Sequence, residues 1–230
     1  MVVFEIVGGN EADPIYQSLE IDNGNRQYSF LSSLVGTSLK VQRAFLSSHI
    51  IKALNFQAIT CLHTYAGEYR PCRVTVGPFE PPEHYRVQAL MDDFVNSVNR
   101  IWEATDAIAL ASLVLWRLNY IHPFINGNGR TARATCYFVL CVKFGGWLPG
   151  QSILPELLRR EHARYVDALK KADESVATGP LDLSVLHALI SELLAEQISG
   201  SAGAQPNSSP PPSPALQTLL LPPPVEPIDP

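Results

Sequence analysis

The sequence has little positive charge. Among its 230 residues, 17 Lys and Arg stand against 22 Asp and Glu, which gives a formal net charge of −5. A protein that binds nucleic acid through a broad basic surface carries an excess of Lys and Arg. This balance therefore argues against nucleic acid as a partner.

Long apolar runs are also missing. The uncharged run from Ala107 to Trp116 is far shorter than the ~20 residues that a membrane helix needs. The first residues, MVVFEIVGGNEADP, contain no basic segment and carry Glu5 and Glu11, unlike a secretory signal. We therefore expect no membrane partner and a cytoplasmic location.

Cysteine is scarce and shows no pattern of paired ligands. The four cysteines, Cys61, Cys72, Cys136 and Cys141, form neither a C-x-x-C pair nor a spacing typical of a zinc site. We interpret them as reduced thiols, two of which (Cys136 and Cys141) lie in a predicted helix.

Most of the proline lies at one end of the chain. Ten of the 19 prolines fall within residues 201–230, where the only charges are Glu226 and Asp229. Because this segment is poor in large apolar residues, we expect a disordered tail over 199–230. Residues 211–214 fit the P-x-x-P pattern that SH3-like domains bind. Two interpretations stay open for the tail, a site for an SH3-like partner and an inert flexible segment.

Helical patterns dominate the rest of the chain. Apolar residues three and four apart predict helices over 84–102, 105–119, 128–144, 155–173 and 182–198, with one or two more over 37–63. Segment 105–119 is apolar on nearly all sides, which is typical of a central helix, and Thr105 is its expected N-cap. Within 69–79, Val74 and Val76 alternate with polar residues, which favours a short hairpin. The first 28 residues show weak periodicity and receive no assignment.

The segment HPFINGNGRTAR, from His122 to Arg133, has the composition of an anion site. The run Gly127-Asn128-Gly129 allows successive backbone N–H groups to turn toward one point at the start of a predicted helix. Arg130 and Arg133 are three residues apart and share a helix face, and a guanidinium binds phosphate oxygens in pairs. The segment therefore predicts a polyphosphate site.

Three further residues of this segment have predicted roles. His122 can accept a proton from an incoming hydroxyl at neutral pH. Phe124 anchors the loop in the core, and Asn126 offers a carbonyl oxygen to a hard cation. Held phosphates, neutralised charge and a base are what phosphoryl-type transfer requires. The competing interpretation is a structural histidine, an ordinary turn and a solvated arginine face.

The same segment resembles the Fic-family motif, H-P-F-x-[D/E]-G-N-[G/A]-R-x-x-R, at every fixed position except one. Leu62-His63 and the run Ala66-Gly67-Glu68-Tyr69-Arg70 are similar to the segment that leads into the family's flap, and Tyr165 to Asp173 to a later helix. The likeness covers about residues 38–175. It implies an all-α, Fic-type helical bundle with a short β-hairpin flap. The chain would then comprise an N-terminal extension over 1–37, a Fic domain with flanking C-terminal helices over 38–198, and the tail.

The resemblance implies a protein adenylyltransferase. Most Fic domains transfer AMP from ATP to a Ser, Thr or Tyr hydroxyl of a target protein, with release of pyrophosphate. The residues implied to act on the nucleotide are His122 as base, Gly127, Asn128 and Gly129 as phosphate cradle, Arg130 and Arg133 on the outer phosphates, and Tyr165 and Asp173 at the nucleoside. Those implied to dock the target are the flap residues Arg73, Val74, Thr75, Val76 and Gly77, which would add a strand to the bound peptide.

Asn126 is the departure from the motif. The family usually has Asp or Glu there, as the protein ligand of Mg²⁺. An amide oxygen can still coordinate, but it lacks the charge, so Mg²⁺ would be held more weakly. Beside ATP as co-substrate with Mg²⁺, the departure leaves open another nucleotide, another phosphate-containing group, or a nucleotide-binding interaction module without catalysis.

Inhibition is a second departure. Many Fic proteins are inhibited by a Ser/Thr-x-x-x-Glu-Gly/Asn helix, whose Glu would pair here with Arg133. No Glu of this chain precedes Gly or Asn, and the nearest approaches are Ser18-x-x-x-Asp22-Asn23 and Ser32-x-x-x-Gly36-Thr37, of which the second has no acid. Either the chain is not inhibited in this way, or an inhibitory partner supplies the Glu.

Overall fold

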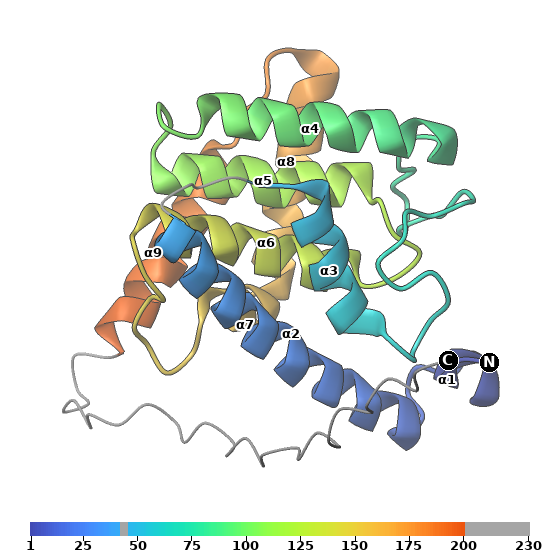
Figure 1. The fold of residues 1–230 in the computed structure, drawn as a ribbon. Coiled ribbons are helices and arrows are strands. Elements are labelled where there is room, and N and C mark those ends of the chain that lie inside the picture. The colour runs from blue at the N-terminus through green and yellow to red at the C-terminus, as the bar shows by residue number, and fades with distance from the viewer. Residues whose placement is uncertain (42–45, 201–230) are drawn as a thin grey trace, which may run out of the picture.

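The computed structural model describes residues 1–41 and 46–200, which fold into a bundle of helices (Figure 1). The helices are α1 (Val3–Ile6), α2 (Pro14–Val41), α3 (Ser48–Ile59), α4 (Val87–Ile101), α5 (Ala107–Ile121), α6 (Asn128–Lys143), α7 (Leu154–Arg160), α8 (His162–Thr178) and α9 (Ser184–Ser199), with a 3-10 turn η1 (His84–Arg86). These residues contain no β-strand, so the predicted all-α class is confirmed. Residues 201–230, with the predicted SH3-binding segment, lie outside the described residues.

The antiparallel pair α5 and α6 forms the centre of the bundle (Figure 1). Most residues of both helices are buried, and the apolar composition of α5 predicts its central place. The N-cap of α5 is Asp106, whose carboxylate accepts hydrogen bonds from the N–H groups of Ile108 and Ala109. The prediction of Thr105 as N-cap was wrong by one residue, since aspartate also caps well and its carboxylate reaches both N–H groups.

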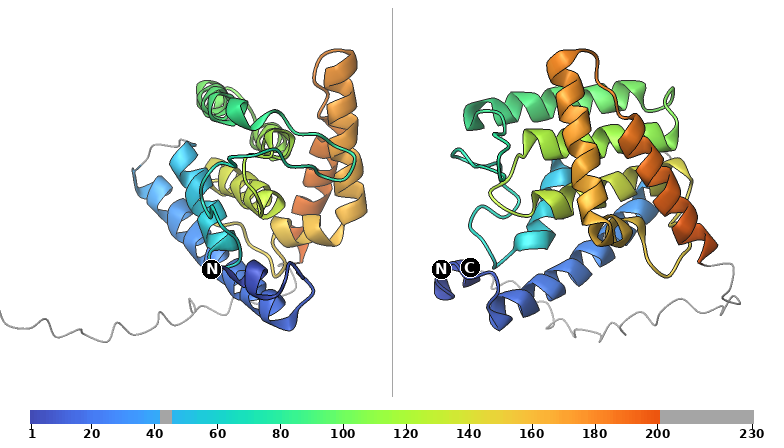
Figure 2. Two further views of the ribbon diagram at one scale, coloured as in Figure 1. Left: turned by 90° about the vertical axis from the view of Figure 1, so that its right-hand side faces the viewer. Right: turned by 180° about the vertical axis from the view of Figure 1, so that it is seen from behind.

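The other helices cover this pair on three sides. Helix α4 packs on α5, while α2 and α3 pack on α6. Helices α7, α8 and α9 close the back of the bundle (Figure 2). The loop between α5 and α6, which holds the motif, is therefore left at one end of the central pair.

Helix α2 is the main element that the sequence did not assign. It runs over 28 residues and packs against α3 and α6, so the predicted domain division at residue 37 falls inside it. Its buried residues are Tyr16, Asn23, Gln27, Leu31 and Val35. Two of the five are polar, which hides the helical pattern from a search for apolar periodicity. No helix in residues 1–41 and 46–200 is both long and apolar enough to cross a membrane.

Two other predictions need correction. The segment predicted as one helix over 155–173 forms two helices, because the backbone at Glu161 leaves the helical region (φ −86°, ψ 35°) between α7 and α8. The predicted hairpin is reduced to a single antiparallel bridge. In it, Val76 and Phe79 exchange two backbone hydrogen bonds of 3.0 Å around Gly77 and Pro78. The next pairing position is Pro81, which has no N–H group to extend the ladder.

The cysteines match the prediction of free thiols. Cys136 and Cys141 are buried in α6, and burial raises the pKa of both. Cys61 and Cys72 are exposed. All four are free in the described part of the chain.

Candidate active site

The loop between α5 and α6 places His122 at the point where α5 ends. Its backbone is left-handed, with φ 50° and ψ 60°, and its N–H group donates to the carbonyl of Leu118 at 3.0 Å. This conformation is uncommon for a residue with a side chain. It costs on the order of 1–3 kcal/mol and persists only where neighbouring contacts hold it.

His122 is half-buried, and its imidazole forms a hydrogen bond with the backbone of Asn119. Because a backbone carbonyl only accepts, one ring nitrogen carries the proton and the other is an acceptor. Burial lowers the pKa of His122 to about 4; the Asn119 bond opposes this shift, and the positive charge of Arg70 adds to it. The ring is therefore neutral at pH 7, the state in which it can accept a proton.

Asn128 closes the motif loop by binding Phe124 twice. Its Oδ1 accepts from the Phe124 N–H group at 2.9 Å, and its Nδ2 donates to the Phe124 carbonyl at 2.8 Å. The Phe124 ring is fully buried and packs on Tyr69, with 5.7 Å between the ring centroids. Because the Asn128 side chain holds the loop, only its backbone N–H group remains for the predicted phosphate cradle.

Gly127 is the N-cap of α6 and has a left-handed backbone, with φ 74°. A Cβ atom here would lie 2.5 Å from Cγ2 of Ile59 and 3.2 Å from Nδ2 of Asn55, so only glycine fits. No side chain caps the first N–H groups of α6, a helix of 16 residues. Uncapped N–H groups and the helix dipole together favour an anion at this end.

Arg130 reaches from the first turn of α6 to an acid of α2. Its Nη1 lies 3.0 Å from Oε1 of Glu20, and it also donates to the carbonyl of Ala58 at 3.2 Å. Its Nη2 donates to Oδ1 of Asn126 at 2.8 Å. A phosphate that binds Arg130 must therefore replace Glu20, and the replacement is feasible because the carboxylate is 43% exposed.

Arg133 lies against the first turn of α6. A Cβ atom on Gly129 would be 3.2 Å from Nη1 of Arg133, so the guanidinium covers this glycine. Burial raises the pKa of Tyr28 and Tyr165, and the charge of Arg133 opposes both shifts. Within residues 1–41 and 46–200, Arg133 forms no salt bridge, which makes it the more accessible cation of the motif for a phosphate.

The N-terminal residues add a second layer of polar side chains at the loop. The Tyr16 hydroxyl and Nε2 of His63 are 2.8 Å apart, and Oε1 of Glu11 lies 3.6 Å from the same nitrogen. Glu11 also accepts from Nδ2 of Asn126 at 3.3 Å. Burial, together with the charge of Glu11, raises the pKa of Tyr16 to about 12, and burial lowers the pKa of His63.

The nearest match to the inhibitory pattern places its acid at Asp22, but a different acid of α2 pairs with a motif arginine. Glu20 pairs with Arg130. Asp22 is exposed, and Asn23 is buried and donates from Nδ2 to the carbonyl of Thr60 at 2.9 Å. Glu20 of the same chain therefore pairs with Arg130, the first motif arginine. Among the described residues, no acid pairs with Arg133, the second motif arginine.

The predicted flap residues lie at the surface beside the motif loop. Arg73, Thr75, Val76 and Gly77 are exposed and Val74 is half-buried. Arg73 forms a bidentate ion pair with Glu83, across the base of the flap. The ring of Phe79 packs on Tyr120, with 5.8 Å between the centroids. This contact ties the flap to the last turn of α5, next to His122.

The two residues predicted at the nucleoside lie on α8, facing α5. Tyr165 is buried, and its hydroxyl accepts a hydrogen bond from Nδ2 of Asn119 at 2.8 Å. Asp173 accepts from Nε1 of Trp116 at 2.8 Å. Tyr165 is thus linked to His122 through Asn119, and a nucleoside pocket at these two residues stays a prediction.

Asn126 does not fit a magnesium ligand in this arrangement. The side-chain oxygen Oδ1 of Asn126 accepts a hydrogen bond from the cationic Arg130. Its side-chain nitrogen Nδ2 donates to the carboxylate of Glu11. Among the described residues there is no group of three or more His, Cys, Asp or Glu that could hold a metal ion. The prediction of Mg²⁺ at Asn126 therefore gains no support from the side-chain geometry.

The sequence did not mark Asn55, which holds the motif loop from α3. Its Nδ2 donates to the carbonyl of Asn126 at 3.0 Å and to the Thr131 hydroxyl at 3.2 Å, and its Oδ1 accepts from the N–H group of Gly67 at 2.9 Å. It is fully buried on the otherwise apolar inner face of α3. A lone polar residue on that face was the only signal in the sequence.

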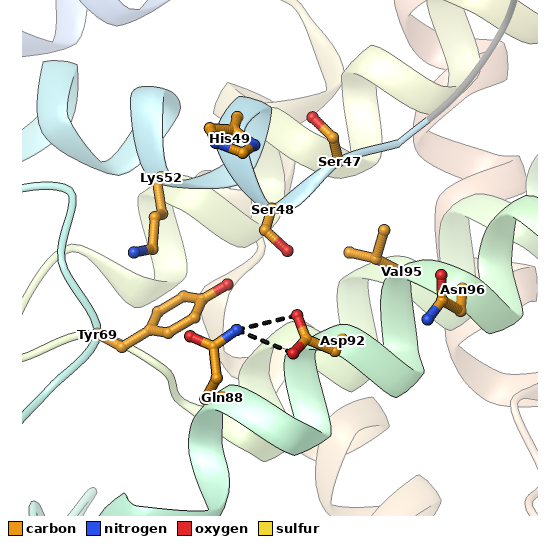
Figure 3. Close-up of a pocket in the computed structure, with 9 residues that line it drawn as sticks. All are labelled: Ser47, Ser48, His49, Lys52, Tyr69, Gln88, Asp92, Val95 and Asn96. Carbon is orange, nitrogen blue, oxygen red and sulfur yellow. Dashed lines mark hydrogen bonds between the residues drawn. The ribbon is translucent and has the colours of Figure 1, made fainter.

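A pocket of about 590 Å³ lies between the start of α3 and α4, outside the motif loop. Figure 3 shows its lining residues, which are Ser47, Ser48, His49, Lys52, Tyr69, Gln88, Asp92, Val95 and Asn96. Tyr69 separates it from the loop, since its ring packs on Phe124. None of the predicted site residues lines this pocket.

Comparison with known proteins finds relatives of the segment that holds the motif loop. The family model described as "Fic/DOC family" matches residues 45–140. The protein adenylyltransferase Fic of Drosophila willistoni is 33% identical over 109 residues, which are 47% of this chain and 20% of that protein. The protein of the same name from Drosophila melanogaster is also 33% identical over 109 residues. The chain therefore spans about a fifth of the length of these relatives.

Solved structures share the fold over most of the chain. Fic-1 of C. elegans has a TM-score of 0.66 at 23% identity, over 84% of this chain and 53% of that chain. A Fic-domain signaling protein from Bacteroides thetaiotaomicron has a TM-score of 0.60 at 21% identity, over 81% of this chain and 75% of that chain. The Fic/DOC family model therefore matches a segment that holds the whole motif from His122 to Arg133, and the fold is similar to that of solved Fic proteins.

Proposed function

We propose that this chain is a protein adenylyltransferase that transfers AMP from ATP to a Ser, Thr or Tyr hydroxyl of a target protein. The observation that carries the proposal is the neutral, half-buried His122 beside the uncapped start of α6 and its two arginines. The relatives named protein adenylyltransferase Fic support this type of transfer.

His122 acts as the base in this reaction. The ring nitrogen that is not bound to Asn119 takes the proton from the target hydroxyl. The hydroxyl oxygen then attacks the α-phosphorus of ATP, and the bond from that phosphorus to the oxygen bridging the β-phosphorus breaks. The products are an AMP ester of the target and pyrophosphate, and the proton stays on His122 until solvent removes it.

The start of α6 stabilises the phosphates. The backbone N–H groups of Asn128 and Gly129 point out of an uncapped helix end and bind phosphate oxygens, while Arg133 neutralises charge on the leaving pyrophosphate. Arg130 adds a second guanidinium once the phosphate has replaced Glu20. Since Asn126 does not fit as a metal ligand, no step is assigned to Mg²⁺ here.

The flap provides the target-binding edge. The residues from Arg73 to Gly77 are largely exposed beside His122, and one bridge already gives Val76 an extended pairing. A target segment that pairs with this edge places its hydroxyl side chain by backbone contacts, which accept many sequences. The side chains of the flap therefore do not identify the target protein.

A second candidate is a nucleotide-binding module without transfer, and the contacts of Arg130 favour it. Glu20 and Asn126 occupy its guanidinium, and position 126 lacks the acid of the family motif. In this alternative, His122 is a structural residue and ATP binds without reaction.

ATP labelled at either the α- or the γ-phosphate separates the candidates. The purified chain is incubated with labelled ATP, Mg²⁺ and a cell lysate, and protein-bound label is counted. We expect label from the α-position only, and its loss in His122→Ala. The matched control is His187→Ala, at a histidine on α9 whose side chain is 44% exposed, and it should transfer label at the wild-type rate.

Two other outcomes identify the alternatives. Label from the γ-position only would indicate a kinase-like reaction. ATP binding without transfer, equal in the wild type and in His122→Ala, would support the binding module.

A further inference from the structure

Arg70 is a buried cation between the motif loop and the flap. It is only 3% exposed, and its guanidinium contacts three backbone carbonyls. Nε donates to the carbonyl of His122 at 2.8 Å, Nη1 donates to that of Cys72 at 3.0 Å, and Nη2 makes a short contact with that of Pro82. Its own N–H group donates to the carbonyl of Pro123 at 2.8 Å.

These contacts join three parts of the chain. Cys72 lies at the first end of the flap and Pro82 at its last end, while His122 and Pro123 belong to the motif loop. Burying a guanidinium is costly, and it is tolerated where its donors are matched by well-placed acceptors. A planar fork with five N–H donors can reach carbonyls in three directions, whereas a lysine cannot.

The hydrogen bond from Arg70 to the His122 carbonyl lies at a strained point of the backbone. His122 has a left-handed backbone, and the contacts that hold it are its N–H bond to Leu118 on one side and the Arg70 bond to its carbonyl on the other. A strained residue keeps its conformation only where such contacts fix both ends of the peptide unit.

Resting on the proposed function, we infer that Arg70 is a positioning residue that fixes both ends of the flap to the backbone of His122. A target segment bound along the flap is thereby held at a constant distance from the base. Transfer requires the hydroxyl oxygen and the α-phosphorus to be in line, and a misplacement of about 1 Å can reduce the rate by about 100-fold.

Two substitutions separate the charge of Arg70 from its geometry. Arg70→Met keeps an unbranched side chain and removes all donors and the charge. Arg70→Lys keeps the charge and one point of donation but cannot bind three carbonyls. The matched control is Arg86→Met, at an exposed arginine just beyond the flap.

The first readouts do not need enzyme activity. The pKa of His122 is followed by NMR titration, and hydrogen exchange is followed at the amides of Val76 and Phe79. In Arg70→Met we expect the pKa of His122 to rise slightly, because burial remains the main cause of its depression, and these amides to exchange at least about tenfold faster. In Arg70→Lys we expect the pKa to stay low and the amides to exchange faster, while Arg86→Met matches the wild type in both.

The kinetic readout applies where AMP transfer is observed. We expect both Arg70 variants to lose about 100-fold in kcat/KM for the target, with the Kd for ATP unchanged. Arg70→Lys carries the test if Arg70→Met does not fold. Wild-type amide exchange and wild-type kcat/KM in folded Arg70→Lys would overturn the inference. If no AMP transfer occurs at all, the proposed function fails, and the exchange and pKa readouts still decide the role of Arg70.

Discussion

His122 combines a common residue type with an uncommon environment. The residue is half-buried, one ring nitrogen binds the backbone of Asn119, and Arg70 lies close enough to disfavour the charged form. The sequence marks this histidine through its neighbours in the motif. It could not show the burial that mainly lowers the pKa of the ring, nor the added effect of Arg70, which lies 52 residues away along the chain.

The depressed pKa of His122 predicts the pH dependence of transfer. Protonation removes the base, and with a folded-state pKa of about 4, kcat/KM should stay level as the pH falls to 6 and should drop only near pH 4–5. Because the folded protein binds a proton at His122 less readily than the unfolded chain does, His122 contributes stability that is fully present above pH 6.5. This contribution is lost as the pH falls through about 4. A pH–rate profile measured under single-turnover conditions checks this. A midpoint near 6.5 would mean that the base is solvated.

Glu20 competes with phosphate for Arg130, so its neutralisation should strengthen nucleotide binding. Glu20→Gln should lower the Kd for ATP by about 1.4- to 5-fold, since a partly exposed ion pair contributes about 0.2–1 kcal/mol. Isothermal titration calorimetry with ATP measures the change. Asp22→Asn, an exposed acid on the same helix, is the control and should bind as the wild type does. Equal affinity in all three proteins would show that ATP does not reach Arg130.

Asn126→Asp tests whether position 126 can hold a metal ion. A carboxylate binds divalent cations better than an amide does, so the variant should need a several-fold lower Mn²⁺ concentration for half-saturation in the presence of ATP. Mn²⁺ binding followed by electron paramagnetic resonance gives this value, with Asn25→Asp on the exposed side of α2 as control. An unchanged Mn²⁺ requirement would show that residue 126 is not a ligand.

The elements differ in how far the sequence revealed them. Helices α4, α5 and α6 carry nearly continuous apolar faces, and their extents were predicted to within a few residues. Helix α2 was missed because Asn23 and Gln27 occupy its buried face, where they donate to carbonyls of Thr60 and Leu54. Polar residues satisfied by distant carbonyls leave no periodic signal. Because α2 was not assigned, the ion pair of its Glu20 with Arg130 could not be predicted.

The start of α6 depends on a single glycine. Gly127→Ala should destabilise the protein by about 3 kcal/mol, because the added Cβ meets Ile59 at 2.5 Å and the backbone is left-handed. Urea unfolding measures the loss. Gly146→Ala, where nothing lies within 4 Å of the new Cβ, should change stability by less than about 1 kcal/mol. Equal stability of the two variants would mean that the loop adapts to a side chain.

At the scale of the whole molecule, the domain is larger than the segment that the family model matches. The match covers residues 45–140, yet α2 packs on α3 and α6, and α9 packs on α5 and α7. Leu31 and Val35 of α2 belong to the same core as Leu186 and Ile190 of α9. The helices outside the matched segment therefore complete the core that supports the motif loop.

This shared core predicts that α2 unfolds together with the rest of the bundle. Leu31→Ala, at a fully buried position, should cost about 2–5 kcal/mol, whereas Ile21→Ala, at a position 65% exposed, should cost less than about 1 kcal/mol. Denaturant unfolding is followed by tryptophan fluorescence and by far-ultraviolet circular dichroism. The two transitions should coincide in every variant. A separate early transition in circular dichroism would show that α2 is an independent appendage.

The proposed transfer is tested most directly by the stoichiometry of its two products. Mass spectrometry identifies the adduct on the modified protein after incubation with ATP, and a coupled assay counts the pyrophosphate released. We predict an AMP ester on a hydroxyl side chain and one pyrophosphate per AMP, both lost in His122→Ala and both kept in His187→Ala. An AMP adduct that forms equally in His122→Ala, or an adduct other than AMP, would contradict the proposed reaction.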